Sequence, residues 1–331
     1  MNTQNATQTL INKYTIYKNK LLGAGSFSKV YLGEIKSNNI KIAIKIINNS
    51  DLIKSELDIL NIIKNNPHQN IISCIDIVTN INNTNIIFEY CDSGDLRELL
   101  KKPIKEDYVK FYFLQLASAL KHLHILKIQH GDIKPRNILL TNKKKILKLA
   151  DFGFSSINKP PDILCGSPLY MAPEMLTNNS YNKQTDLWSI GIIMFEMLFS
   201  FHPFSKCANL DELKEAISKT NLIIPPINTK NTNISDECTD LLKMLLQKSC
   251  NKRITWDSFF DHIWLFGFEE NNTSNIINSG TPDLHIRGSS IGHIGLPPPP
   301  VLNNKSEYID KNIKIIDNYY DTLSEDVFTL E

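Results

Sequence analysis

A short polar stretch in the middle of the chain offers the residue types that phosphoryl transfer requires. It reads His-Gly-Asp-Ile-Lys-Pro-Arg-Asn over residues 130–137 and is followed by Asp151-Phe152-Gly153. Asp132 could receive a hydroxyl proton, and Lys134 could meet a phosphate. Asn137 and Asp151 carry oxygens of the kind that magnesium prefers, so they could hold this ion on a nucleotide triphosphate. Phosphoryl transfer depends on positioning and charge neutralisation, and this set supplies both.

A second candidate site for phosphate lies near the N-terminus. Gly23-Ala24-Gly25-Ser26-Phe27-Ser28 falls between two predicted strands, where backbone amides without bulky side chains can approach phosphates closely. The same pattern is also typical of an ordinary hairpin turn. Lys45 follows in a strand otherwise made of isoleucine and alanine, which argues against an ordinary surface lysine.

The hydrophobic pattern predicts a strand-rich segment followed by a helical one. Between Tyr14 and Ile47, β-branched and aromatic residues cluster around turn signals, which predicts three antiparallel strands. Residues 50–64 have apolar side chains at helical spacing, and Pro67 blocks the continuation. The further predicted elements are strands at 71–78 and 85–90, a helix at 108–124, two strand-like pieces around 142–145 and mainly helix over 185–264. The fold class is therefore α+β.

Both motifs of the central region occur in order, and Ala172-Pro173-Glu174 comes after them. From these residues the chain resembles the eukaryotic protein kinase family of the serine/threonine type, over roughly Tyr14 to Phe266. The resemblance implies a two-lobed protein kinase fold. A small five-stranded antiparallel N-lobe with one helix would span 14–90, and the hinge with a larger, mainly helical C-lobe would span 91–266. Residues 1–13 are expected to be a flexible N-terminus, and 267–331 a disordered linker.

The resemblance also implies a nucleotide site that takes ATP and Mg²⁺. Lys45 would pair with the α and β phosphates and with Glu56 on the following helix, for which Asp58 is the rival partner. Ser28 stands where the family has a third glycine, and Phe88 would close the pocket behind the adenine. The other residues implied to contact the nucleotide are Gly23, Ala24, Gly25, Ser26, Phe27, Ser28, Val30, Ala43, Leu139, the backbone of Glu89 and Cys91, and Asp95.

The catalytic roles follow from the same resemblance. Asp132 would orient a serine or threonine hydroxyl of a protein substrate and take its proton, while Lys134 would stabilise the transferring phosphoryl group. Asn137 and Asp151 would hold magnesium. The implied supporting contacts join Ser167 to Asp132 and Lys134, Glu174 to Arg253, and Asp186 to the backbone near His130.

Gly131 departs from the family pattern, which has an arginine there that belongs to a basic pocket for a phosphorylated activation loop. The segment 154–165 holds only two hydroxyls, on Ser155 and Ser156. Ile163 stands where a phosphorylated threonine is common. The two departures agree, so we expect activity without phosphorylation of this loop.

Two motifs point to a branch of the family. Cys-Gly-Ser-Pro-x-Tyr-Met-Ala-Pro-Glu over 165–174 and Glu-Tyr-Cys-x-x-Gly-Asp-Leu over 89–96 are most similar to the autophagy-initiating kinases.

Two alternatives to a protein kinase remain open. His-Gly-Asp with a later asparagine is also typical of aminoglycoside and choline kinases. Lys134-Pro135, Ala172-Pro173-Glu174 and the Asp-x-Trp-Ser-x-Gly pattern at 186–191 argue against these small-molecule kinases, because they build a peptide-binding loop. A non-catalytic pseudokinase is the other alternative, and the complete set of reactive residues argues against it.

The amino-acid composition limits which kinds of binding partner and which cellular compartment we expect. Six scattered cysteines without a Cys-x-x-Cys pair argue against zinc and disulfides and for a reducing compartment. We therefore expect a cytoplasmic protein, located in the host cytoplasm if the gene is viral. The net charge of +1 gives no reason to expect nucleic-acid binding. No apolar run approaches the ~20 residues that span a bilayer, and the polar N-terminus is no signal peptide.

The C-terminal region carries a separate pattern. The tract Pro297–Pro300 predicts a semi-rigid spacer, and the residues after 301 are acidic. Ile309, Ile313, Ile316, Tyr320 and Leu323 would fall on one stripe of a helix. Such a stripe needs a surface, which could be the kinase domain or another protein; a chance pattern in an isoleucine-rich tail is the alternative.

Overall fold

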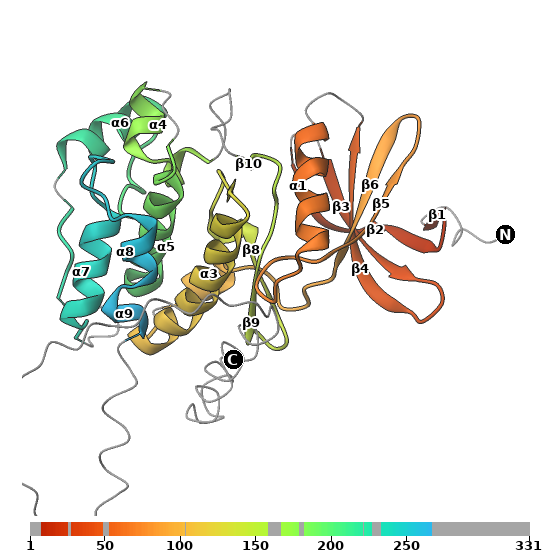
Figure 1. Ribbon diagram of the computed structural model, residues 1–331, viewed down its shortest axis with the longest axis horizontal. Helices are drawn as coiled ribbons and strands as arrows, with labels where there is room; N and C mark the ends of the chain where they lie inside the picture. The colour runs from red at the N-terminus through yellow and green to blue at the C-terminus, as the bar shows by residue number, and fades with distance from the viewer. Residues whose placement is uncertain are drawn as a thin grey trace, which may run out of the picture. The chain divides into compact units, whose positions relative to one another are not determined.

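A computed structural model describes residues 8–25, 28–48, 53–102, 104–157, 167–178, 182–220, 222–226 and 233–266 (Figure 1). All of them belong to one compact unit, residues 1–267. Ser26, Phe27, Ile163, the proline tract and the predicted C-terminal helix lie outside the described residues. Within the described part, no helix is long and apolar enough to cross a membrane.

The N-terminal part is an antiparallel sheet with the strand order β1-β2-β3-β4-β6-β5. Ile42 and Ile44 of β4 pack with Tyr14, Ile16 and Ile87 into a core on one face of the sheet, because alternate side chains of a strand point to the same side. The strands are β1 Gln8–Ile11, β2 Tyr14–Ala24, β3 Ser28–Ile35, β4 Ile40–Asn48, β5 Cys74–Thr79 and β6 Asn83–Glu89. The five expected strands are present.

The sixth strand, β1, corrects the expectation of a flexible segment over residues 1–13 for the part at Gln8–Ile11. Gln8–Ile11 pairs antiparallel with β2, from Gln8 opposite Tyr17 to Ile11 opposite Tyr14. Asn12 makes the turn between the strands at φ 52°, a backbone conformation that asparagine tolerates better than most residues. The segment therefore extends the sheet instead of hanging free.

One helix, α1 (Ile53–Asn65), packs beside the sheet. It buries Ile59, Leu60 and Ile63, which recur at helical spacing, and with them the carboxylate of Glu56.

The remaining residues form the helical part. Its central helix, α5, is buried along its whole length, which explains why it is apolar all round. The helices are α2 Arg97–Leu100, α3 Glu106–Ile125, α4 Pro173–Asn178, α5 Thr185–Phe199, α6 Leu210–Lys219, α7 Asp236–Leu245, α8 Trp256–Phe260 and α9 Ile263–Phe266.

Two pairs of short strands lie between the sheet and the helices in Figure 1. β8 (Ile138–Thr141) pairs with β9 (Ile146–Leu149), and β7 (Ile128–Gln129) pairs with β10 (Ser156–Ile157). The β8–β9 hairpin therefore connects the 130–137 stretch to Asp151, and the β7–β10 pair joins the strand before that stretch to the strand after Asp151.

The predicted ion pair of Glu174 and Arg253 is confirmed. Arg253 donates to both carboxylate oxygens at 2.8 and 2.9 Å, and its side chain is fully buried. The guanidinium also lies over the Trp188 ring at 5.4 Å. The pair holds the start of α4 against the segment before α8.

Because Arg253 is buried, Arg253→Leu should leave the Glu174 carboxylate without its partner and lower the free energy of unfolding by about 3–5 kcal/mol. The matched control is Arg97→Leu, which breaks an exposed bidentate pair with Asp95 and should cost less than about 1 kcal/mol. Urea unfolding of the full chain measures both values. Equal losses would contradict the role of burial.

Candidate active site

The backbone of the 130–137 stretch is held in place by the first turn of α5. The buried carboxylate of Asp186 accepts hydrogen bonds from the backbone amides of His130, at 2.9 Å, and Gly131, at 3.0 Å. This contact was predicted. The His130 ring in turn bridges to the carbonyl of Ala150 at 3.1 Å and packs on Phe152. One carboxylate therefore holds the backbone that carries Asp132, and His130 links that backbone to the residues beside Asp151.

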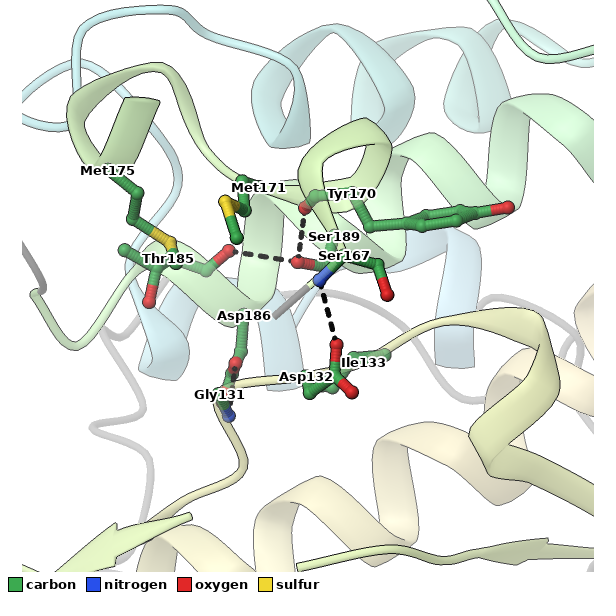
Figure 2. Close-up of a pocket in the computed structure, with 10 residues that line it drawn as sticks. All are labelled: Gly131, Asp132, Ile133, Ser167, Tyr170, Met171, Met175, Thr185, Asp186 and Ser189. Carbon is green, nitrogen blue, oxygen red and sulfur yellow. Dashed lines mark hydrogen bonds between the residues drawn. The ribbon is translucent and has the colours of Figure 1, made fainter. Parts of the chain in front are cut away.

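The Asp132 carboxylate is held by three donors. Lys134 Nζ and Asn137 Nδ2 donate to Oδ2 at 2.6 and 3.1 Å. The amide of Ser167 donates to Oδ1 at 3.0 Å, the contact that Figure 2 shows. Lys134 also donates to the Ser167 hydroxyl at 2.8 Å. These contacts confirm the predicted hydrogen bonds of Ser167 with Asp132 and Lys134. They also hold the Asp132 carboxylate beside the Lys134 ammonium.

A small cavity lies behind these groups, between the 130–137 stretch, the 167–171 loop and the first turn of α5. Figure 2 shows Asp186, Ser189 and Met175 among the residues that line it. Its volume of about 10 Å³ is close to the least that one water needs. The cavity is therefore no substrate pocket, and an acceptor must approach Asp132 from the cleft side.

Among the described residues, Asp151 and Asn137 each keep one side-chain oxygen without a hydrogen-bond donor. Asp151 adopts φ 67°, a strained conformation that directs Oδ1 to Lys45 at 3.0 Å, and its side chain is 44% exposed. Burial alone would raise the pKa of Asp151, but the Lys45 ammonium outweighs it and lowers the pKa. Asn137 uses its amide nitrogen on Asp132, which leaves Oδ1 available. One carboxylate and one amide oxygen beside a phosphate site fit magnesium.

Lys45 joins α1 to the active site. Its ammonium lies 2.6 Å from Glu56 and 3.0 Å from Asp151, and its side chain is only 12% exposed. Burial lowers the pKa of Lys45, but the two carboxylates outweigh burial and the pKa is raised, so the group stays charged. Asp58 is exposed. The predicted pairing of Lys45 with Glu56 is thus confirmed and the rival partner is wrong.

The residues expected around the adenine lie on facing elements. Val30 and Ala43 are half-buried on β3 and β4, Leu139 is half-buried on β8, and Phe88 pairs with Ala43 across β4 and β6. Cys91, two residues after the end of β6, has a pKa raised to about 12 by burial, so its thiol stays protonated.

The end of β6 and the segment after it make two contacts that we did not predict. Glu89 forms an ion pair with Lys148 of β9 at 2.7 Å, which ties this segment to the strand before Asp151. Asp95, the expected ribose contact, receives Arg97 on both oxygens, at 2.9 and 2.7 Å. A ribose hydroxyl would have to share these oxygens.

The glycine-rich loop is described on both sides of its tip. Gly23 and Ala24 end β2, Ser28 begins β3, and the amide of Gly25 donates to the Ser28 carbonyl at 2.9 Å. Arg136 reaches across the cleft and donates to the Ala24 carbonyl at 3.2 Å. No pattern in the sequence predicts this contact.

Gly131 occupies a position with little room for a side chain. Its φ is +79°, and a Cβ built there would lie 2.6 Å from the carbonyl oxygen of Phe154. Glycine therefore allows the 130–137 stretch and the segment after Asp151 to approach closely.

Glu196 was also missed by the sequence analysis. It lies buried in α5 and accepts a hydrogen bond from the Tyr170 hydroxyl at 2.9 Å. Burial raises the pKa of Glu196 to about 7, although the bond from Tyr170 opposes the shift. The pair attaches the 167–171 loop to the central helix.

The two-lobed fold and this constellation define a protein kinase domain, and the comparisons agree. The family model for the protein kinase domain matches residues 16–265. The chain belongs to the protein kinase family.

Its relatives are serine/threonine kinases of the predicted branch. The chain is 37% identical over 255 residues to the serine/threonine-protein kinase ULK3 of Homo sapiens, covering 74% of this chain and 53% of the relative. It is 35% identical to atg1 of Dictyostelium discoideum (74% and 38%) and 35% identical to ATG1b of Arabidopsis thaliana (81% and 39%). The chain thus spans about half or less of the length of these relatives. The predicted resemblance and kinase fold are confirmed, while the bounds 14–266 stay a prediction.

The raised pKa of Glu196 gives a prediction for pH. Between its unfolded value of 4.5 and about 7, only the folded protein keeps the proton. The contribution of Glu196 to stability therefore falls as pH rises through this window. The Glu196→Gln variant has no titrating group at this position. The difference in unfolding free energy between the variant and the wild type should therefore shift by about 1–3 kcal/mol in favour of the variant from pH 5 to pH 8. Urea unfolding at several pH values measures this gain, and parallel profiles would contradict it.

Proposed function

We propose that the chain is a serine/threonine protein kinase that transfers the γ-phosphate of ATP to protein hydroxyls. The observation that carries the proposal is that Lys134 and Ser167 both donate hydrogen bonds to the Asp132 carboxylate and are bonded to each other. It keeps an acceptor for the hydroxyl proton beside an ammonium that can neutralise a phosphoryl group. The serine/threonine kinase relatives support the same activity.

ATP and Mg²⁺ are the proposed nucleotide and metal. Asp151 and Asn137 would hold the metal, which supplies charge neutralisation on the phosphates when bound. Lys45 would bind the α and β phosphates, and the amides of the 23–28 loop would cover them. The 2.6 Å contact with Glu56 keeps Lys45 pointed toward the cleft.

We further propose that the kinase is active without phosphorylation of its activation loop. In the unmodified chain Lys45 already contacts Glu56 and Asp151, and Ser167 already contacts Asp132. Gly131 supplies no cation to receive a loop phosphate. The contacts that phosphorylation would otherwise have to assemble are thus supported by residues of the chain itself.

Two further proposals rest on sequence alone. The acidic C-terminal segment with its apolar stripe is proposed as a protein-contact segment, acting within the chain or on another protein. The cytoplasm is the proposed location, since the cysteine pattern suits a reducing compartment.

Loss of either charge at the centre of the site should remove catalysis. Asp132→Asn and Lys45→Met should each reduce Mg²⁺-dependent incorporation of phosphate into protein at least about 100-fold. Asp261→Asn and Lys243→Met, at exposed positions of the helical part, are the matched controls and should retain wild-type rates. Autophosphorylation and transfer to a protein substrate also distinguish this enzyme from a small-molecule kinase or a pseudokinase. Activity of Asp132→Asn at the wild-type level would refute the assignment.

Protein purified after phosphatase treatment should keep its initial rate. Because no phosphate takes part in the proposed active arrangement, the rate should fall by less than about tenfold, which is about 1.4 kcal/mol of barrier. Mock-treated protein is the control. A larger loss that returns after incubation with ATP would reveal a phosphorylation switch.

A further inference from the structure

Arg136 carries a charge that the reaction proposed above does not use. Its side chain is exposed, and among the described residues it makes one hydrogen bond, from Nη2 to the carbonyl of Ala24, a neutral acceptor, at 3.2 Å. Within the described residues, no carboxylate lies within 4.0 Å of it. A guanidinium has five N–H donors in a rigid fork, so most of them remain available.

The guanidinium lies at the edge of the cleft that an acceptor must enter. Arg136 stands two residues after Lys134 and one before Asn137, both of which bond to Asp132. On its far side it reaches the glycine-rich loop, whereas Asp132 faces Ser167. A peptide that presents a hydroxyl to Asp132 therefore passes between the 167–171 loop and Arg136, and its neighbouring side chains come close to the guanidinium.

The surrounding acids are already paired. Asp95 forms an ion pair with Arg97, Glu89 forms one with Lys148, and Asp132 forms one with Lys134. Glu56 and Asp151 share Lys45. The described acids of the cleft thus leave little to attract a basic side chain of a peptide, whereas Arg136 offers an unneutralised cation.

We propose that Arg136 is a specificity-determining residue that binds an acidic or phosphorylated side chain a few residues from the acceptor hydroxyl. The fork geometry favours this chemistry, because a guanidinium binds a carboxylate or phosphate through two parallel hydrogen bonds. A lysine at the same place would supply only a point charge. The proposal rests on the kinase activity proposed above and names the class of substrate for it.

The test uses serine peptides that share a neutral sequence and carry aspartate, phosphoserine or lysine in turn at each of the three positions on either side of the acceptor. For each enzyme the measured quantity is the ratio of kcat/KM for a charged peptide to kcat/KM for its neutral parent. The wild type should prefer an anion at one or more positions by roughly three- to tenfold, as expected for a partly exposed charge-assisted pair. Arg136→Gln should bring this ratio close to one, and Arg136→Glu should reverse it in favour of lysine.

Lys243→Glu is the matched control. It makes the same change of charge at an exposed position of α7 and should keep the wild-type ratios. Arg136→Lys should retain part of the preference, with the larger loss for phosphoserine, which uses the fork.

The outcomes separate the two proposals. If the wild type phosphorylates no peptide, and no protein including itself, the proposed function fails. If it phosphorylates peptides but Arg136→Gln has the wild-type ratios, the specificity role is overturned. An equal rise in KM for ATP with all peptides, at unchanged ratios, would also overturn it and leave Arg136 as a tie to the glycine-rich loop. If Arg136→Glu does not fold, the ratios of Arg136→Gln decide alone.

Discussion

The active site depends on one buried carboxylate. Asp186 at the start of α5 receives two backbone amides of the catalytic loop, and α5 is itself buried along its whole length. The two hydrogen bonds hold the loop against this rigid helix, and water competes little with them because the Asp186 side chain is buried. Asp132, Lys134 and Asn137 are therefore held in place even though the only regular structure among them is the short 3-10 helix Pro135–Asn137.

A second set of contacts joins the sheet to this base. Lys45 bridges Glu56 of α1 and Asp151, Glu89 is tied to Lys148, and Arg136 reaches Ala24. Apart from the pair of Lys45 with Glu56, each contact joins segments that are far apart in the sequence. Lys45, Glu56, Asp151, Glu89 and Lys148 are thus paired with one another, whereas Arg136 meets a neutral acceptor.

The sequence predicted most of the fold because the strands and helices follow hydrophobic periods, and it predicted the reacting groups because their order along the chain is specific. It also predicted the pairs of Asp186 with the loop backbone and of Glu174 with Arg253. It missed β1, since four residues are too few for a period to be recognised. The contacts of Arg97, Arg136, Lys148 and Glu196 were missed because they depend on side-chain directions and on burial, which spacing does not encode.

The ammonium shared by Glu56 and Asp151 has a consequence for inhibitors. A compound that binds behind α1 and displaces Glu56 would break the contact of Glu56 with Lys45 and leave the contact of Lys45 with Asp151. The charge that Asp151 presents to a cation would change as a result. By thermodynamic reciprocity, filling the cation position would then change the affinity of that compound by the same factor. A ligand bound behind α1 would in this way be coupled to occupancy of the cation position without entering the nucleotide site.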